Sequence, residues 1–126
     1  NQAALAGSVK VGKGVILGGY AIVHQYCFLG EYSFCAMGSA VNKDIPAYVK
    51  VRGNPAKPFG INSVGVKRLG YSSETIESLK SAYRTFYRKK LTTDEALLEL
   101  KNSDQNTPEV ISFISSIENS TRGISR

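Results

Sequence analysis

The sequence of 126 residues lacks tryptophan and contains only one histidine, one methionine and two cysteines. No apolar run approaches the roughly 18 residues that a membrane-spanning helix requires. The segment after Asn1 has neither the basic nor the apolar stretch of a secretory signal. With 42% hydrophobic and 21% charged residues, the sequence predicts a soluble, folded chain without a membrane span.

The two cysteines do not form a metal-binding or disulfide pattern. Cys27 and Cys35 lie among apolar residues, they are not spaced as a CxxC pair, and no histidine cluster accompanies them. Buried free thiols in a reducing cytoplasm fit this pattern best. We therefore expect a cytoplasmic protein without a metal site.

The formal net charge of +6 is modest, but one segment is strongly basic. Between residues 80 and 90 there are five basic side chains and no acidic one, namely Lys80, Arg84, Arg88, Lys89 and Lys90. Such a cluster attracts an acidic partner, although a solvated helix face has the same composition. The sequence leaves both interpretations open.

The first part of the chain repeats itself with a period of six residues. One position of the repeat is aliphatic in every copy except one, where a small thiol replaces it: Leu5, Val11, Leu17, Val23, Leu29, Cys35 and Val41. The next position holds small or turn-forming residues, which tolerate a positive φ: Ala6, Gly12, Gly18, His24, Gly30, Ala36 and Asn42. A third position, four residues after the aliphatic one, holds small or β-branched residues and ends at Ile45. This hexapeptide pattern predicts a parallel β-helix with three repeats per coil, and strict spacing argues against an antiparallel sandwich.

The period stops at Pro46, and the next segment contains two glycines and two prolines between residues 51 and 60, which predicts an irregular crossing loop. Three helices are expected after it, starting at Ser72, at the capping box of Thr92 and Glu95, and at Thr107 before Pro108. We therefore expect three regions: the last coils of the β-helix at 1–51, a crossing loop at 52–71 and a small all-α C-terminal domain at 72–126.

Several stretches of the chain resemble the bacterial UDP-N-acetylglucosamine O-acyltransferases. They are Leu5-Ala6-Gly7, residues 21–27, Gly53-Asn54-Pro55-Ala56 with Pro58-Phe59-Gly60-Ile61-Asn62, Gly65-Val66-Lys67-Arg68 and Ser120-Thr121-Arg122-Gly123-Ile124. The resemblance covers the whole chain and matches the C-terminal half of the family. It implies a left-handed β-helix, and because the chain starts without Met inside the repeat, we expect the natural protein to extend upstream of Asn1.

This resemblance implies an enzyme that transfers a 3-hydroxyacyl chain from acyl carrier protein to the 3-hydroxyl of UDP-N-acetylglucosamine, the first step of lipid A biosynthesis. The family acts as a homotrimer with clefts between subunits, and it needs no metal and no dissociable cofactor, since the acyl group is carried on phosphopantetheine. Neither nucleic acid nor a membrane is an expected partner. The general base is a histidine upstream of Asn1, so this chain alone is expected to be inactive.

The resemblance also assigns roles to particular residues. The backbone N–H of Gly7 corresponds to the oxyanion donor, although Gly7 could also be a simple turn glycine. His24 and Gln25 match residues at the substrate cleft, while Asn62 and Arg68 match residues that contact the nucleotide. The basic stretch from Lys80 to Lys90 becomes the candidate docking surface for the acidic carrier protein.

Met37 matches the position whose size sets the acyl-chain length, so a shorter chain is expected. The sequence departs from the family at three positions, with Ser8 in place of a histidine, Val64 in place of a glutamate and Leu69 in place of an arginine. These departures put the sugar and nucleotide contacts in doubt.

Other functions share the fold. A related hexapeptide N-acyltransferase, an acetyl-CoA-dependent hexapeptide transferase and a non-catalytic trimerising or carrier-binding module remain alternatives. A zinc-dependent carbonic anhydrase needs three histidine ligands, and the sequence has one histidine.

Overall fold

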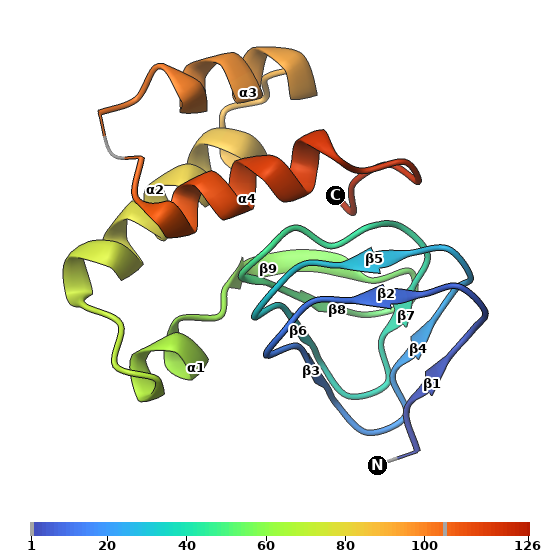
Figure 1. The fold of residues 1–126 in the computed structure, drawn as a ribbon. Coiled ribbons are helices and arrows are strands. Elements are labelled where there is room, and N and C mark those ends of the chain that lie inside the picture. Colours follow the sequence, from blue (N-terminus) through green and yellow to red (C-terminus); the bar gives the residue numbers. More distant parts are fainter. Residues whose placement is uncertain (1, 105) are drawn as a thin grey trace.

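The computed structural model describes residues 2–104 and 106–126 of the chain (Figure 1). Its first part consists of short strands joined by tight corners. The strands are β1 (Ala4–Leu5), β2 (Lys10–Val11), β3 (Ile16–Leu17), β4 (Ile22–Val23), β5 (Phe28–Leu29), β6 (Phe34–Cys35), β7 (Ala40–Val41), β8 (Val49–Arg52) and β9 (Lys57–Ile61). Each of the first seven strands has two residues and falls in one copy of the hexapeptide repeat.

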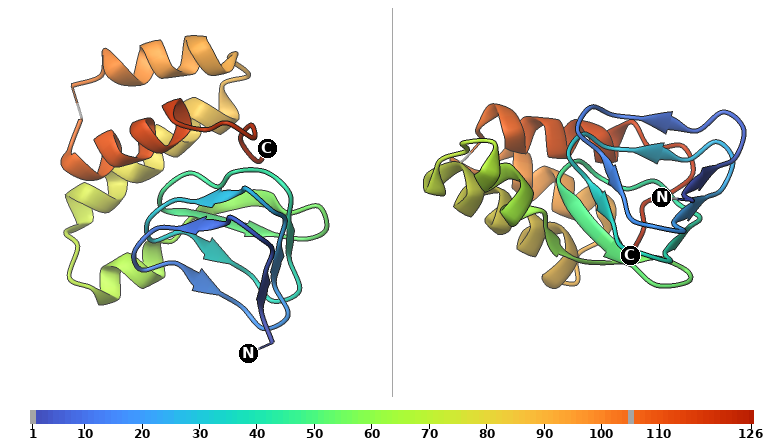
Figure 2. Two further views of the ribbon diagram at one scale, coloured as in Figure 1. Left: turned by 45° about the vertical axis from the view of Figure 1, so that its right-hand side comes forward. Right: turned by 90° about the horizontal axis from the view of Figure 1, so that it is seen from below.

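Parallel pairing shows that three repeats make one coil. Leu5 pairs with Val23, and Val11 pairs with Leu29, in each case 18 residues further along the chain. The three faces are the sheets β1-β4-β7, β2-β5 and β3-β6-β8-β9, and in the last of these β8 pairs antiparallel with β9. Figure 2 shows the triangular cross-section that these faces enclose. The predicted hexapeptide β-helix is confirmed.

The predicted aliphatic positions point to the interior of the coil. Val23, Leu29 and Val41 are buried in the second and third coils, and Cys35 lies among them. In the first coil the matching positions are open, with Leu5 47% and Val11 45% exposed. The same pattern therefore gives different burial at the two ends of the stack.

Glycine at the corners serves a different purpose from the one expected. A Cβ at Gly30 would lie 2.3 Å from the backbone nitrogen of Ala47, and one at Gly18 would lie 2.6 Å from that of Met37. Close approach of the next coil therefore excludes a side chain there. The positive φ angles fall two residues later, at Ser8, Gly14, Tyr20, Tyr26, Tyr32 and Gly38. Tyrosine rarely adopts this conformation, so the coil geometry, and not residue preference, imposes it.

The last coil is two residues shorter than the others. Ile45 pairs with Leu29 and Val51 pairs with Cys35, each 16 residues along instead of 18. The expectation that Ile45 occupies the third position of its repeat is therefore wrong, because a shortened corner after Val41 brings Ile45 into the aliphatic stack. The repeat continues through β8 and does not stop at Pro46.

The segment expected to be an irregular crossing loop is largely ordered. β8 turns at Gly53, whose φ is 96°, and returns as β9, which pairs antiparallel with β8. The short helix α1 (Ser63–Arg68) follows directly. Glycine and proline in this segment mark the tip and edge of a hairpin rather than the absence of strands.

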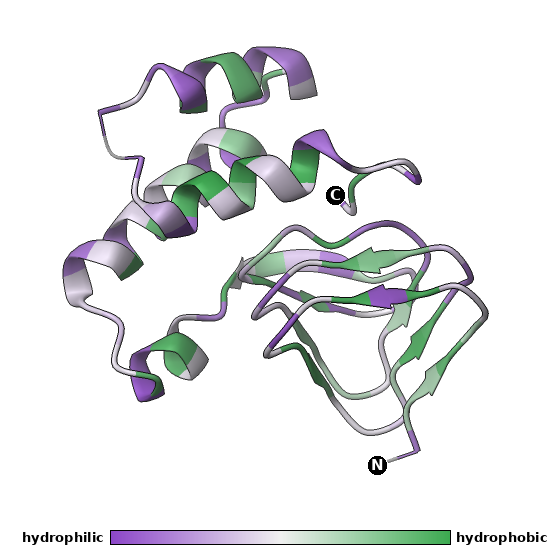
Figure 3. Ribbon diagram, in the orientation of Figure 1, coloured by the Kyte–Doolittle hydropathy of each residue, from purple (hydrophilic) through white to green (hydrophobic). Residues whose placement is uncertain are grey.

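Three further helices follow, namely α2 (Ser73–Arg88), α3 (Thr93–Lys101) and α4 (Pro108–Glu118). Their predicted N-caps are confirmed, since the side chains of Ser72, Thr92 and Thr107 each accept a backbone N–H of the first turn. Their apolar stripes are buried, and Figure 3 shows apolar residues recurring along α2 and α4. None of the helices in residues 2–104 and 106–126 is long and apolar enough to cross a membrane.

The helical segment covers the last coil of the β-helix. On α4, the Ser116 hydroxyl accepts the backbone N–H of Ala47 at 2.9 Å in a buried position. The buried carboxylate of Asp44 accepts the N–H of Phe28 at 2.8 Å, the hydroxyl of Ser120 at 2.6 Å and the N–H of Arg122 at 3.2 Å. Asp44 thereby fastens the C-terminal tail to the coil below it.

Candidate functional site

Three of the predicted site residues meet at one corner of the β-helix. Gly7 follows β1 and Gln25 follows β4, and the register that pairs Leu5 with Val23 places Gly7 beside Gln25. The backbone N–H of Tyr26 donates to the carbonyl of Gly7 at 3.1 Å, which fixes the two coils against each other. His24 and Gln25 are both exposed at this corner.

The fold does not require glycine at position 7. A Cβ at Gly7 would meet nothing within 4 Å, whereas the corner glycines Gly18 and Gly30 are each enclosed by backbone. The N–H of Gly7 makes no hydrogen bond to any residue in the described ranges 2–104 and 106–126. Free space and a free donor are what an oxyanion site needs, so this geometry favours that role over a turn glycine.

His24 is exposed, and the coil accepts a side chain at its position. Its own N–H donates to the carbonyl of Val41, so the backbone is part of the coil ladder while the imidazole is not buried. Ala6 and Asn42 occupy the same corner of the neighbouring coils. Because all three residues at this corner carry a side chain, the imidazole is compatible with the coil geometry and is free to contact a ligand.

Met37 lies at a different corner, between β6 and β7, and its side chain is 77% exposed. Neighbouring side chains on the same edge are also apolar and exposed, including Ile16, Tyr20 (68%) and Ile22. An exposed apolar edge of this kind is typical of a surface that another protein surface covers.

Asn62 lies at the third corner and is buried. Its side-chain Nδ2 donates to the carbonyl of Tyr32 at 3.0 Å, and its Oδ1 accepts the N–H of Gly65 at 3.3 Å as the N-cap of α1. The amide therefore joins α1 to the β-helix. One Nδ2 hydrogen and one Oδ1 lone pair remain for a ligand, so nucleotide contact stays a prediction that has to coexist with this structural role.

Arg68 ends α1 and is exposed, as are the neighbouring Val64 and Leu69. No ion pair involves Arg68 in the part of the chain that the structure describes. The guanidinium is thus available to bind an anion, whereas the two apolar neighbours add no charge to the helix surface.

The predicted site residues do not come together within one chain. Gly7, His24 and Gln25 follow the first face of the coil, Met37 follows the third face, and Asn62 is tied to the corner between the second and third faces. Corners of a triangular prism point away from one another. One copy of the described residues 2–104 and 106–126 therefore does not bring all of these residues into a single site.

The five basic residues of the predicted docking stretch also separate in the structure. Lys80, Arg84 and Arg88 line a groove against β9, at Gly60 and Ile61. Lys89 instead forms an ion pair with Glu99 of α3. Lys90 lies beyond the end of α2 with a φ of 56°.

Two basic residues on the hairpin of β8 and β9 were missed by the sequence analysis. Lys50 and Arg52 on β8 both contact the ring of Phe59 on β9, at 4.8 and 4.5 Å from the ring centre. Arg52 fell in the expected irregular loop at 52–71, and Lys50 fell at the end of the expected β-helix at 1–51. Alternation of basic residues at positions 50 and 52 was the available signal, because a two-residue period places them on one face of a strand.

Both cysteines are buried free thiols, as predicted. Burial raises the pKa of Cys35 to about 12, and burial is also the largest cause of the raised pKa of Cys27. A thiol with a raised pKa is a poor nucleophile at neutral pH. The cysteines therefore serve as core side chains and do not extend the candidate site.

Comparison with known proteins gives one consistent family. The family model described as Udp N-acetylglucosamine O-acyltransferase, Domain 2, matches residues 44–125. The acyl-[acyl-carrier-protein]–UDP-N-acetylglucosamine O-acyltransferase of Pseudomonas paraeruginosa is 52% identical over all 126 residues, which span 49% of that protein. The enzyme of the same name from Stutzerimonas stutzeri is 50% identical over the same share. The chain thus spans about half the length of the curated relatives that it matches.

Solved structures agree with this result. LpxA from Acinetobacter baumannii has a TM-score of 0.95 and 41% identity, covering 100% of this chain and 49% of that one. LpxA from Bacteroides fragilis, described as a UDP-N-acetylglucosamine acyltransferase, has a TM-score of 0.97 and 34% identity, again with 100% and 49% coverage. The similarity therefore includes the β-helix and the helical segment together.

Proposed function

This chain belongs to the UDP-N-acetylglucosamine O-acyltransferase family, and from that premise we propose that the whole protein transfers a 3-hydroxyacyl chain from acyl carrier protein to UDP-N-acetylglucosamine. The acceptor is the 3-hydroxyl of the sugar, and the reaction begins lipid A biosynthesis. The observation that carries this proposal is the match of the entire chain, at 52% identity, to an enzyme named for that reaction.

Further coils are proposed to stack on the first coil of this chain. Two observations support this extension. The chain spans 49% of its relatives, and the interior side chains Leu5 and Val11 are about half exposed where the later coils bury theirs. Upstream coils would cover this apolar end and would carry the histidine that acts as general base.

The chemistry requires a base and an oxyanion donor. A base removes the proton of the sugar hydroxyl as its oxygen attacks the thioester carbonyl, and negative charge then develops on the carbonyl oxygen. The free N–H of Gly7 can donate to that oxygen. His24 and Gln25 lie at the same corner and are placed to bind the acylated sugar, while Asn62 and Arg68 are assigned to the nucleotide.

A homotrimer is proposed because the assigned residues occupy three corners of one prism. Neighbouring copies could bring the corner of Gly7 against the corner of Met37 of the next copy, and the exposed apolar edge around Met37 would be covered by that contact. An exposed Met37 side chain would then narrow the acyl groove. A shorter acyl chain is the expected specificity.

The remaining properties in the proposal are those that family membership implies. The coil is left-handed, residues 72–126 form a small all-α domain, and the protein works in the cytoplasm without a metal or a dissociable cofactor. Its acyl donor is carried on the phosphopantetheine of acyl carrier protein. Buried free thiols support a reducing compartment.

The test is acyl transfer by the full-length protein with a series of 3-hydroxyacyl carrier proteins of increasing chain length. Transfer to UDP-N-acetylglucosamine with a preference for shorter chains is expected, and replacing Met37 with glycine should move the preference toward longer chains. Absence of transfer for every chain length would refute the proposal. Preference for acetyl-CoA as donor would identify a different hexapeptide transferase.

A further inference from the structure

Three tyrosine rings meet where α1 joins the β-helix. Tyr32 and Tyr48 occupy the same corner in successive coils, and their rings are stacked with 5.7 Å between the ring centres and 18° between the planes. Tyr71, which follows α1, meets both rings in an edge-on contact, with its ring centre 6.2 and 6.1 Å from theirs. Aromatic rings attract one another in these stacked and edge-on arrangements. The ring of Tyr71 therefore ties the chain after α1 to the β-helix.

A chain of hydroxyl groups runs along the same contact. The hydroxyls of Tyr48 and Tyr71 lie 3.2 Å apart, and that of Tyr48 donates to a carboxylate oxygen of Glu31 at 3.4 Å. Because a hydroxyl has one hydrogen, Tyr71 is then the donor to Tyr48. Burial is the largest cause that raises the pKa of Tyr48 above its ordinary value, so this phenol stays neutral at physiological pH. A hydrogen bond thus adds to the ring contacts that hold Tyr71.

Helix α1 is anchored at both ends to the same two tyrosines. At its start, the backbone N–H of Asn62 donates to the carbonyl of Tyr48 at 2.8 Å, and the side-chain Nδ2 donates to the carbonyl of Tyr32 at 3.0 Å. At its end, Gly70 turns the chain with a φ of 93° and brings Tyr71 back onto their rings. A helix of six residues has little stability of its own. Its position therefore depends on these anchors.

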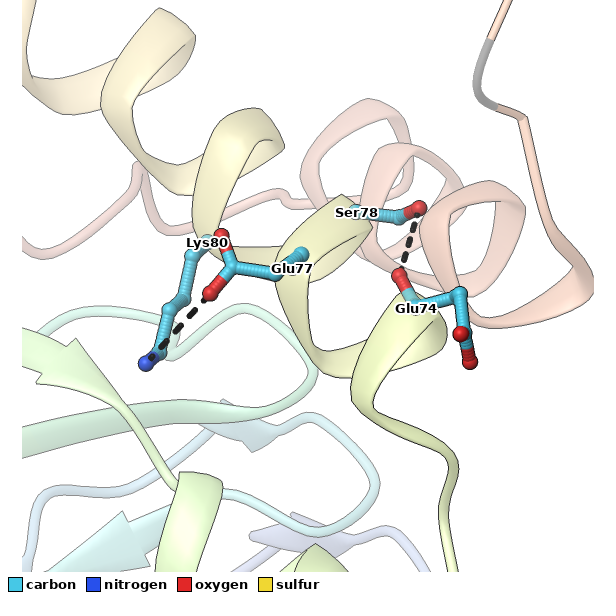
Figure 4. Close-up of polar contacts among 4 residues, drawn as sticks. All are labelled: Glu74, Glu77, Ser78 and Lys80. Atoms are coloured by element: carbon cyan, nitrogen blue, oxygen red, sulfur yellow. Dashed lines mark hydrogen bonds and ion pairs between the residues drawn. The ribbon is translucent and has the colours of Figure 1, made fainter.

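The first turns of α2 follow Tyr71 and are stabilised within that helix. The hydroxyl of Ser78 donates to the carbonyl of Glu74 at 3.0 Å, and Lys80 lies 3.9 Å from Glu77 (Figure 4). Neither contact reaches α1. The residues on either side of Tyr71 are exposed, whereas Tyr71 itself is half-buried. Between the two helices, it is therefore the side chain of Tyr71 that holds the chain against the β-helix.

Both residues assigned to the nucleotide depend on where α1 lies. Asn62 is the N-cap of α1, and Arg68 is its last residue, with an exposed side chain. A guanidinium grips a phosphate through two parallel hydrogen bonds, so its direction matters as well as its charge. A misplacement of about 1 Å is enough to weaken a fit of this kind. The anchors of α1 therefore decide whether both side chains can contact the same nucleotide.

We propose that Tyr71 is a positioning residue for the nucleotide site, which acts through Tyr32 and Tyr48 to hold α1, and with it Asn62 and Arg68, in place. This inference rests on the proposed function, which assigns those two side chains to the nucleotide. Tyr71 itself need not touch the ligand. Its ring preorganises the site, which lowers the cost of binding.

The experiment uses the full-length protein and two measurements. Calorimetry gives Kd for UDP, which requires no acyl transfer, and steady-state acyl transfer gives kcat and KM for each substrate. Tyr71→Ala removes the ring, and Tyr71→Phe keeps the ring but removes the hydroxyl. Leu97→Ala is the matched control, because it truncates another half-buried side chain of the helical segment, on α3, which packs against the core without holding α1.

For Tyr71→Ala, Kd for UDP and KM for UDP-N-acetylglucosamine should each rise about tenfold. We expect kcat and KM for the acyl carrier donor to stay unchanged. Tyr71→Phe should recover most of the affinity, since the ring contacts remain. Leu97→Ala should lower the unfolding temperature but leave Kd for UDP unchanged.

A double substitution tests whether Tyr71 acts through α1. In the Arg68→Ala background, Tyr71→Ala should raise Kd for UDP by less than about threefold, because the guanidinium is no longer present to be misplaced. Full additivity of the two changes would contradict the positioning role.

Three further results would overturn the inference. They are an unchanged Kd for UDP in Tyr71→Ala, an equal rise in Leu97→Ala, and an equal loss of affinity in Tyr71→Phe, which would assign the effect to direct contact between the hydroxyl and the ligand. Failure of the wild-type protein to bind UDP or to acylate UDP-N-acetylglucosamine is a separate outcome, which refutes the proposed function itself.

Discussion

The two ends of the β-helix carry the same sequence pattern but differ in what covers their interior. In the first coil, Leu5 and Val11 are 47% and 45% exposed. In the last coil, Val41 and Ile45 occupy the equivalent positions and are fully buried. Helix α4 and the C-terminal tail lie over the last coil through Ser116 and other polar contacts, while nothing in the described part of the chain covers the first coil.

This difference shows that the hexapeptide pattern specifies which side chains point into the coil, but not whether they are buried. An aliphatic residue at the repeat position points inward, and its burial depends on the coil or cap stacked against it. The helical segment is therefore part of the core of the β-helix and not an appendage. Four pairs of substitutions can break or sharpen this comparison of the open and the capped end.

The largest effect is expected at the centre of the aliphatic stack. Leu29 lies between Val11 and Ile45 and is fully buried. Leu29→Ala should lower the free energy of unfolding by about 4 kcal/mol, because it removes buried apolar contacts and leaves a cavity. Urea titrations of the full-length wild-type and variant proteins, at the same protein concentration, measure this loss.

Leu5→Ala in the same full-length protein provides the comparison. If upstream coils stack on Leu5, as we propose, its loss should approach that of Leu29→Ala. A loss below about 1 kcal/mol, as expected for a half-exposed side chain, would mean that the first coil is open in the whole protein too.

The next largest loss of stability is expected on removing Asp44, whose hydrogen bonds join the capped end to the C-terminal tail. Asp44→Ala should cost about 3 kcal/mol, because the N–H of Phe28 and the donors of Ser120 and Arg122 lose a charged acceptor that is itself buried. Proteolysis within residues 119–126 should accelerate as well. Lys43→Ala, at the exposed neighbouring position, should change neither the stability nor the cleavage rate. An equal effect there would contradict the conclusion that the hydrogen bonds of Asp44 hold the tail on the last coil.

A third comparison uses two glycines with opposite surroundings. Gly30→Ala should destabilise the protein by about 2 kcal/mol, because its Cβ would meet the backbone of Ala47 at 2.3 Å. Gly7→Ala should leave the unfolding transition unchanged, since its Cβ meets nothing within 4 Å. Acyl transfer by the Gly7→Ala protein should nevertheless fall, because the methyl group obstructs approach to the free N–H. Equal loss of stability at both positions would remove the argument for Gly7 as an oxyanion donor.

Sequence reasoning predicted the repeat and the helix starts because both depend on local rules. The aliphatic period and the caps at Ser72, Thr92 and Thr107 act over four to six residues, and the structure confirms them. Two features depended on contacts between distant segments and were not predicted. The shortened corner that places Ile45 on Leu29 is one, and the hairpin of β8 and β9 is the other.

The candidate site was predictable only in its parts. Resemblance supplied the residues, but their distribution over three corners follows from an 18-residue coil, and the structural role of Asn62 follows from its contact with Tyr32, which lies 30 residues away. Neither can be inferred from local spacing. The open surroundings of Gly7 likewise required the position of the neighbouring coil.

The smallest effect is expected where α4 meets the capped end. Ser116 accepts the buried N–H of Ala47 at 2.9 Å and donates to the carbonyl of Phe113 at 2.7 Å. Ser116→Ala should cost about 1 kcal/mol, because the N–H of Ala47 keeps no partner in a buried position. Ser115→Ala, at the adjacent exposed position, is the matched control and should be neutral. Hydrogen exchange at the Ala47 amide distinguishes the cause, since a lost acceptor accelerates exchange there before the remainder of the coil, whereas uniform acceleration would mean that α4 contributes to the cap only through its apolar contacts.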